Sequence, residues 1–234
     1  MLHLFDSFDL IDLTHTIDKD IPTWDGERGF SEHIDASYEQ GCCLKRYCME
    51  AGIGTHMDAP QHFIKGALHV GQIKLEHLFV PAYVVDVSQK VKSDDDYNIT
   101  VEDMRAFEKK YEPIQENTLV LAYTGWGARW PDMQKYRNAD KEGNMHFPGF
   151  SVDAGQYLLE KKVVGIGIDT FSPDGSNYNF PLHTAFLGAG KYLIENVANL
   201  EKVPPVGAYI VALPLKIKGG TESPARIMAL VPKK

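Results

Sequence analysis

Residues 1–234 read as a single α/β domain, a mixed sheet with flanking helices, and three observations predict this fold class. Two runs rich in β-branched and apolar residues, 118–123 and 163–169, have the composition of buried strands. Helical patterns over 100–111 and 151–162 precede them, and alternation of helices with strands is typical of α/β folds. The chain shows no repeat, low-complexity tract or linker, so one domain is the simplest organisation.

The first half of the chain reads mainly as strands and loops. Residues 10–14 alternate like a strand, and proline and glycine punctuate the following loop, which carries Trp24. Residues 43–50 read as a strand that leads into a histidine-rich stretch, and residues 82–87 read as a further strand.

The second half contains the helices. Thr100 and Asp103 form a capping-box pattern before apolar residues at helical spacing, and Pro113 stops that helix. Ser151 caps a second helix. Residues 128–150 form a long loop, which is uncommon in a compact domain unless it is functional, so we expect it to line a site. The chain closes with two more expected strands, 209–217 and 225–231.

Charge and composition exclude several functional classes. The formal net charge of −8 argues against a nucleic-acid partner, because phosphate binding requires a basic face. No apolar run approaches the length needed to cross a membrane, and residues 1–12 lack the basic flank of a secretory signal. The odd number of cysteines (Cys42, Cys43 and Cys48) is typical of reduced thiols, which favours a cytoplasmic location.

The residues that can carry chemistry concentrate in Gly-Thr-His-Met-Asp-Ala-Pro-Gln-His-Phe, residues 54–63. In an extended chain the side chains at i and i+2 point to the same side, so His56 and Asp58 can reach one common point. Pro60 keeps the preceding residue out of the helical region. Imidazole together with carboxylate suits Zn²⁺, Mn²⁺ or Fe²⁺ better than Ca²⁺ or Mg²⁺. An isolated pair of this kind is more often a surface or capping feature.

A second pair of candidate ligands, His183 and Glu195, lies late in the chain. On one straight helix these two residues would be about 18 Å apart, too far to share a metal ion. Gly188 and Gly190 favour a break in the helix, which would let Glu195 turn back toward His183.

On these residues the chain resembles the cyclase family of metal-dependent hydrolases, whose branches include bacterial kynurenine formamidase (arylformamidase) and isatin hydrolase. Residues 54–63 match the family motif H-T-G-T-H-x-D-A-P-x-H-F from its third position onward. Glu195 follows His183 at the family's spacing of twelve residues. The segments HTAFLGAGKYLIENVANL, VALPLKIKG, DIPTWDGERGF and GIDTFSPD extend the resemblance from near residue 10 to near residue 231.

The resemblance implies a function and a set of roles. The chain is expected to hydrolyse a carbon–nitrogen bond of an amide, formamide or cyclic imide, with Zn²⁺ or Mn²⁺, one or two ions per chain, activating water. His62 would be the general acid and base, and Trp24 a wall of a pocket for a substrate that is aromatic. The metal ligands would be His56, Asp58, His183 and Glu195. The resemblance also implies a single domain of the swivelling β/β/α type, assembled as a homo-oligomer (dimer or tetramer).

One position departs from the family pattern. The family's first histidine, four residues before His56, falls on Gly52, which has no donor atom. We therefore expect one well-held metal bound by Asp58, His183 and Glu195, or a pair completed differently. Glu50 and Cys48 are the candidate substitutes in the sequence, and Gly52→His is expected to supply the absent donor.

Structural roles remain as alternatives. A single histidine is more often structural than ligating, and Trp24 is as well explained by core packing as by substrate contact. Gly52 also leaves open a degenerate family member that binds a metal or small ligand without turnover. No feature of the sequence favours an interaction module.

Overall fold

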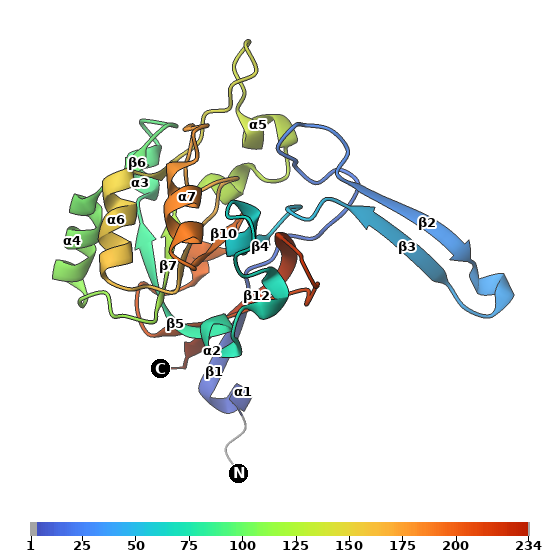
Figure 1. The fold of residues 1–234 in the computed structure, drawn as a ribbon, viewed down its shortest axis with the longest axis horizontal. Helices are drawn as coiled ribbons and strands as arrows, with labels where there is room; N and C mark the ends of the chain where they lie inside the picture. The colour runs from blue at the N-terminus through green and yellow to red at the C-terminus, as the bar shows by residue number, and fades with distance from the viewer. Residues whose placement is uncertain (1–3, 234) are drawn as a thin grey trace.

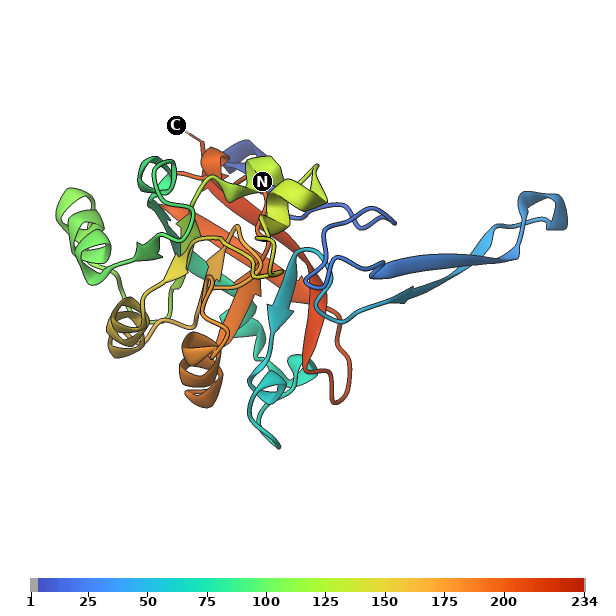
Figure 2. The same ribbon diagram turned by 90° about the horizontal axis from the view of Figure 1, so that it is seen from above.

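The computed structural model describes residues 4–233, and its main sheet closes into a barrel (Figures 1 and 2). Around the ring the strands run β12-β11-β5-β7-β9-β10-β4, and β4 pairs again with β12, while β1 extends the sheet from β12. The strands are β1 Phe8–Asp12, β2 Phe30–Ala36, β3 Leu44–Met49, β4 His56–Asp58, β5 Phe79–Asp86, β6 Asn98–Ile99, β7 Leu119–Tyr123, β8 Gly149–Phe150, β9 Gly165–Ile168, β10 Tyr192–Glu195, β11 Ala208–Pro214 and β12 Glu222–Pro232. The α-helices are α1 Leu4–Ser7, α2 Leu75–Leu78, α3 Ser88–Val91, α4 Val101–Lys110, α5 Met133–Arg137, α6 Val152–Glu160 and α7 Pro181–Gly188.

The ring combines parallel and antiparallel pairing. Strands β5, β7, β9 and β10 are parallel neighbours, and each connection between them contains one of the helices α4, α6 and α7. These three helices lie side by side against one face of the sheet (Figure 1). Strands β4, β11, β12 and β1 pair antiparallel. The fold is therefore mixed α/β, as the sequence predicts, whereas the swivelling β/β/α assignment stays a prediction.

Alternate residues of the strands feed two separate cores. In β7, Leu119 and Leu121 point to the core inside the ring, and Val120 and Ala122 point to the core beneath the helices. The inner core also receives Met57 of β4 and Ile194 of β10. Because successive side chains of a strand face opposite sides, the neighbours of Met57 and Ile194 must face the helices. This alternation decides where the candidate ligands point.

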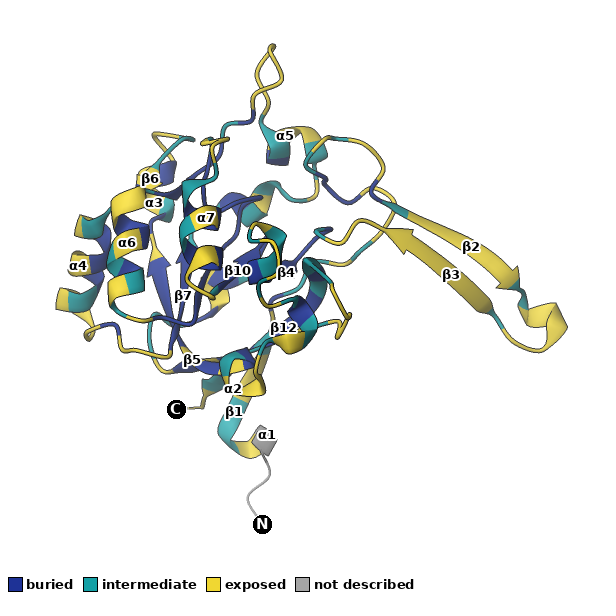
Figure 3. Cartoon of the chain, in the orientation of Figure 1, coloured by how far each residue is buried: buried dark blue, intermediate teal, exposed yellow. Residues whose placement is uncertain are grey.

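The largest difference from the sequence-based expectation is a hairpin arm formed by β2 and β3. The predicted strand at 43–50 is present as β3, but it pairs only with β2 and stands out from the body (Figures 1 and 2). Both strands are exposed or half-buried along their length (Figure 3). Strand β2 is polar at four of its seven positions, so its pattern does not stand out from a loop in the sequence.

Local signals in the sequence place helices α4 and α6. Helix α4 begins at Val101 behind the Thr100 and Asp103 capping box, and α6 begins behind the Ser151 cap. The expected loop at 128–150 is partly ordered, because it contains α5 and β8. Within residues 4–233, no helix has the length and apolar character to cross a membrane.

Candidate metal centre

Strand β4 brings the first candidate ligands together. It lies between β10 and β12, and His56 is directly opposite Glu195 of β10, while Asp58 is directly opposite Glu222 of β12. Residues opposite one another on neighbouring strands share a face of the sheet. Met57 faces the inner core, so His56, Asp58, Glu195 and Glu222 face the side that carries the helices.

The break predicted between His183 and Glu195 is confirmed. Helix α7 carries His183 and ends at Gly188, and Gly190 adopts a left-handed conformation with φ +73°. This conformation suits glycine, which has no Cβ to clash with the backbone. The chain then reverses into β10, which delivers Glu195 back to the side of His183.

Two imidazoles share two carboxylates in the centre. His183 Nε2 lies 3.3 Å from Asp58 Oδ2 and 3.3 Å from Glu195 Oε1. His56 Nε2 lies 3.3 Å from Glu195 Oε2 and 3.5 Å from Asp58 Oδ1. Each carboxylate therefore directs one oxygen to each histidine, and all four side chains are buried. The structure thus brings together the four residues that the sequence predicts as ligands.

Backbone and carboxylate partners orient both rings. His56 Nδ1 is 2.8 Å from the Gly54 carbonyl oxygen, and His183 Nδ1 is 2.6 Å from Asp174 Oδ2. A hydrogen bond at one ring nitrogen selects which nitrogen remains free to coordinate, here Nε2 in both rings. Asp174 lies in GIDTFSPD, where the sequence shows a resemblance but no role for this residue.

The charges in this centre are strongly coupled. Burial lowers the pKa of His183, but the carboxylates of Asp174, Asp58 and Glu195 outweigh burial and raise this pKa well above its ordinary value. The pKa of His56 is raised for the same reasons, burial opposing and Glu195 and Asp58 prevailing. The carboxylates of Asp58 and Glu195 therefore favour positive charge between them.

The donor set fits a divalent metal ion. Asp58 Oδ1, Asp58 Oδ2 and Glu195 Oε1 are buried and accept no hydrogen bond. A buried charged oxygen without a partner costs more than the about 1–3 kcal/mol of a neutral group, so it requires a cation nearby. His56, Asp58 and Glu195 could hold one ion, and Asp58, His62 and His183 could hold another. Both sets combine imidazole and carboxylate, which suit Zn²⁺, Mn²⁺ and Fe²⁺.

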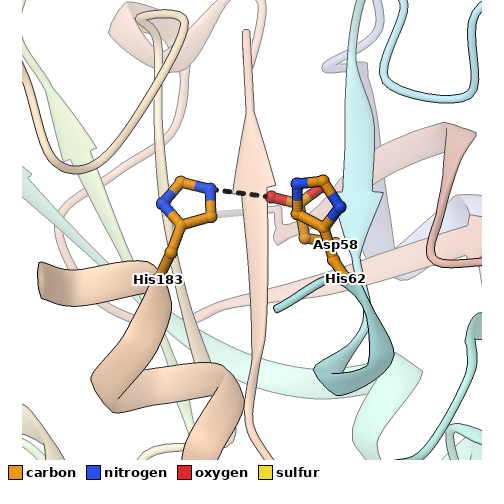
Figure 4. Close-up of side chains that lie close together, drawn as sticks. All are labelled: Asp58, His62 and His183. Atoms are coloured by element: carbon orange, nitrogen blue, oxygen red, sulfur yellow. Dashed lines mark ion pairs between the residues drawn. The ribbon is translucent and has the colours of Figure 1, made fainter. Parts of the chain in front are cut away.

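His62 lies at the edge of the same centre. It ends the short 3₁₀ turn Pro60–His62, directly after β4, and faces His183 across Asp58 (Figure 4). Its ring centre is 6.0 Å from that of His183, and its Nε2 is 3.4 Å from Glu222 Oε2. About 30 % of its side chain is exposed, compared with 5 % for His183. His62 can therefore reach both the centre and the entering substrate.

An aromatic cavity of about 510 Å³ opens above these residues. Trp24 lines it, as predicted, together with Phe63, Phe171 and Phe180. The Trp24 ring packs edge-on against Phe171 at 6.1 Å and tilted against Phe180 at 6.0 Å. Trp24 is thus half-buried in an aromatic cluster and also faces the cavity. Phe171 and Phe180 were not among the predicted site residues, because isolated phenylalanines in loops carry no spacing signal.

The prediction that residues 128–150 line the site is wrong for the described chain, since the cavity wall includes none of them. The segment supports Trp24 from behind instead. Arg137 donates from Nη2 to the Trp24 carbonyl oxygen at 3.0 Å, and Phe147 packs edge-on against the indole at 6.1 Å. This segment therefore supports the cavity wall by packing behind Trp24.

The surroundings of Gly52 differ from the expectation. Cys48 is exposed on the arm, whereas Glu50 and Gly52 line the cavity. An ideal Cβ on Gly52 would lie 3.1 Å from Glu222 Oε2 and 3.3 Å from His56 Nε2. A side chain at residue 52 would therefore be in tight contact with Glu222 and His56, and the gain expected from Gly52→His stays a prediction. Glu222 was not among the predicted site residues, because it lies in no motif and reaches the centre only through the pairing of β12 with β4.

Comparisons with known proteins agree with this geometry. The sequence profile of the family described as "Putative cyclase" matches residues 11–175. Isatin hydrolase from Roseibium aggregatum is 37 % identical over 189 residues, covering 77 % of this chain and 72 % of that protein. Kynurenine formamidase from Bacillus thuringiensis is 26 % identical over 220 residues, covering 92 % of this chain and 94 % of that protein. The crystal structure of an isatin hydrolase bound to the product analogue thioisatinate superposes with a TM-score of 0.92 at 29 % identity, covering 98 % of this chain and 95 % of that one.

Proposed function

The chain belongs to the cyclase family, and on this premise we propose that it is a metal-dependent hydrolase of a carbon–nitrogen bond in an amide, formamide or cyclic imide. The observation that carries the proposal is the pair of buried carboxylates, each shared by two oriented imidazoles, beneath an aromatic cavity. We propose His56, Asp58, His183 and Glu195 as the metal ligands, with Zn²⁺ or Mn²⁺ as the ion.

The bound metal supplies Lewis acidity, which makes water a nucleophile at neutral pH and polarises the substrate carbonyl. The protein's own residues supply the remaining requirements. Asp174 and the Gly54 carbonyl hold the two ligating rings in place. His62 is the half-exposed imidazole beside the centre, so we assign it the proton transfers, from the attacking water and then to the leaving nitrogen.

The cavity favours a planar substrate. Trp24, Phe63 and Phe180 present ring surfaces on which an aromatic molecule can stack. A volume of about 510 Å³ lies within the usual range for small-molecule sites, about 300–1,000 Å³. The relatives are named for isatin and for a formamide of kynurenine, so a bicyclic aromatic amide and an aryl formamide are the first substrates to test.

The test is hydrolysis by the purified protein before and after metal removal. We expect one or more of isatin, aryl formamides and cyclic imides to be cleaved, with activity lost on chelation and restored by Zn²⁺ or Mn²⁺. Turnover that is unaffected by complete metal removal would contradict the proposal. The alternative of a degenerate member without turnover is not favoured, because the relatives are named as an isatin hydrolase and a kynurenine formamidase.

We further propose that residues 1–234 act as one cyclase-like domain of the swivelling β/β/α type, in the cytoplasm, and that the chain forms a homo-oligomer. The hairpin arm supports the last of these. A two-stranded hairpin alone in water is marginally stable, yet this one exposes Ile34, Leu44 and Tyr47. We infer that a second copy of the chain covers them. The chain leads from both ends of the arm to residues of the cavity wall. Trp24 lies in the loop before β2, and Glu50 immediately follows β3.

A further inference from the structure

The two halves of the centre differ in the residues that lie beside them. The half around His183 has His62 beside it, to which we assign the proton transfers, in addition to the shared carboxylates. The half around His56 has only His56, one oxygen of Asp58 and one of Glu195. Metals of this class take at least four donors, so the half around His56 has at least one coordination position that water or a further protein donor can fill.

Glu222 lies beside this half of the centre. It stands opposite Asp58 on β12, on the other side of β4 from Glu195, so three carboxylates from three adjacent strands share one face. Its Oε2 is 3.1 Å from the position that a Cβ of residue 52 would occupy, and His56 Nε2 is 3.3 Å from the same position. Its side chain is 21 % exposed and lines the same cavity.

We propose that Glu222 supplies the fourth protein donor of a metal position formed with His56, Asp58 and Glu195, taking the place of a side chain at residue 52. The inference rests on the metal-dependent function proposed above. Gly52 leaves room for this carboxylate, because a Cβ there would be in tight contact with Glu222 Oε2 at 3.1 Å. Its φ is not in the left-handed region, unlike that of Gly54, so backbone conformation does not explain the glycine.

The proposal has a consequence for metal selectivity. A position with one imidazole and three carboxylates is richer in oxygen than one with two imidazoles. Carboxylate oxygens suit Mn²⁺, whereas imidazole suits Zn²⁺. Glu222 therefore shifts the preference of the His56 position toward Mn²⁺ relative to a site with histidine at residue 52.

The experiment measures Mn²⁺ and Zn²⁺ binding to the metal-free protein by calorimetry, with Mn²⁺ followed separately by electron paramagnetic resonance. We expect Glu222→Gln, which keeps the shape of the side chain, to weaken Mn²⁺ binding at one position by at least about tenfold. In the double variant Gly52→His with Glu222→Ala, the ratio of Zn²⁺ to Mn²⁺ affinity should rise. Glu50→Gln is the matched control, since Glu50 lines the same cavity.

The outcomes separate this inference from the proposed function. Unchanged stoichiometry and affinity for both metals in Glu222→Gln overturn the inference, even if the rate falls, because Glu222 would then act only on His62. Weaker binding in Glu50→Gln in place of Glu222→Gln also overturns it. If Asp58→Asn retains all its metal, the proposed metal centre itself is wrong.

Discussion

His62 and Asp58 are four residues apart, but the structure places them differently. Asp58 is buried with both oxygens shared between imidazoles, whereas His62 is half-exposed at the entrance. We predict that Asp58→Ala loses metal and activity together, because it removes a donor from both halves of the centre. His62→Ala should retain metal and lose activity by about 10²–10⁴-fold, the usual contribution of a general acid or base.

Metal content by atomic emission, measured beside initial rates, tests this pair. Loss of metal in His62→Ala would identify His62 as a ligand in the Asp58, His62 and His183 group. Full metal occupancy in Asp58→Ala would contradict the centre as described. His69→Ala serves as a control, since its ring caps the short turn Val70–Gln72 outside the cavity wall.

His15 offers a prediction on stability at low pH. Its ring stacks on Trp130 at 3.8 Å, and its Nε2 is buried without a hydrogen-bond partner. Burial lowers the pKa of His15 to about 4. The unfolded chain, with an ordinary pKa near 6.5, therefore binds a proton that the folded chain excludes, so stability falls as the pH drops from about 6.5 toward 4.

The size of this effect is at most about 3.4 kcal/mol, from the difference between a pKa of 6.5 and one of about 4. We expect His15→Phe, which keeps a flat ring on Trp130, to lose less free energy of unfolding than the parent between pH 7 and pH 5. Urea unfolding at the two pH values measures this difference. Equal losses in the two proteins would mean that His15 is not protonated on unfolding in this range.

At the scale of elements, the arm formed by β2 and β3 makes the clearest prediction. Its exposed apolar residues have no cover within the described chain, and both of its ends join the cavity wall. The combined change of Ile34, Leu44 and Tyr47 to Thr keeps β propensity while removing apolar surface. We expect this variant to shift from oligomer to monomer at micromolar concentration while retaining its metal.

Light scattering after size exclusion measures the mass of each variant. His33→Thr is a matched control, because it changes an exposed residue of the same strand without removing apolar area. A parent protein that is already monomeric would contradict the proposed assembly, and so would an oligomer that survives the triple change.

At the scale of the whole molecule, sequence reasoning succeeded where the signal was local. Capping residues and Pro113 gave the limits of α4, and the glycines after α7 correctly indicated the turn that returns Glu195 to His183. The four candidate ligands could be predicted because the chain resembles a known family over most of its length. The closure of the barrel and the position of Glu222 could not be predicted, because both depend on β12 pairing with β4 across more than 160 residues. Strand β2 was not predicted because its mostly polar sequence resembles that of a loop.

The position of the centre links metal binding to the closure of the barrel. Strand β4 has only three residues, yet it joins β10 to β12 and carries two of the four predicted ligands. Without a cation, three buried carboxylate oxygens on this seam have no hydrogen bond. Metal bound to the folded state should stabilise it by about 2.7 kcal/mol at a hundredfold excess over the dissociation constant.

We therefore predict that hydrogen exchange will report metal binding most strongly at the seam. Amides of residues 56–58, 193–195 and 222–223 should exchange more slowly in the metal-bound protein, because local opening there separates ligands held by one ion. Strands β5 and β7, parallel neighbours within the ring, serve as the internal reference. Exchange measured by mass spectrometry with and without Mn²⁺ tests this. If metal binding slowed exchange equally in the seam and in the reference strands, the metal would stabilise the fold as a whole and not the pairing of β4 in particular.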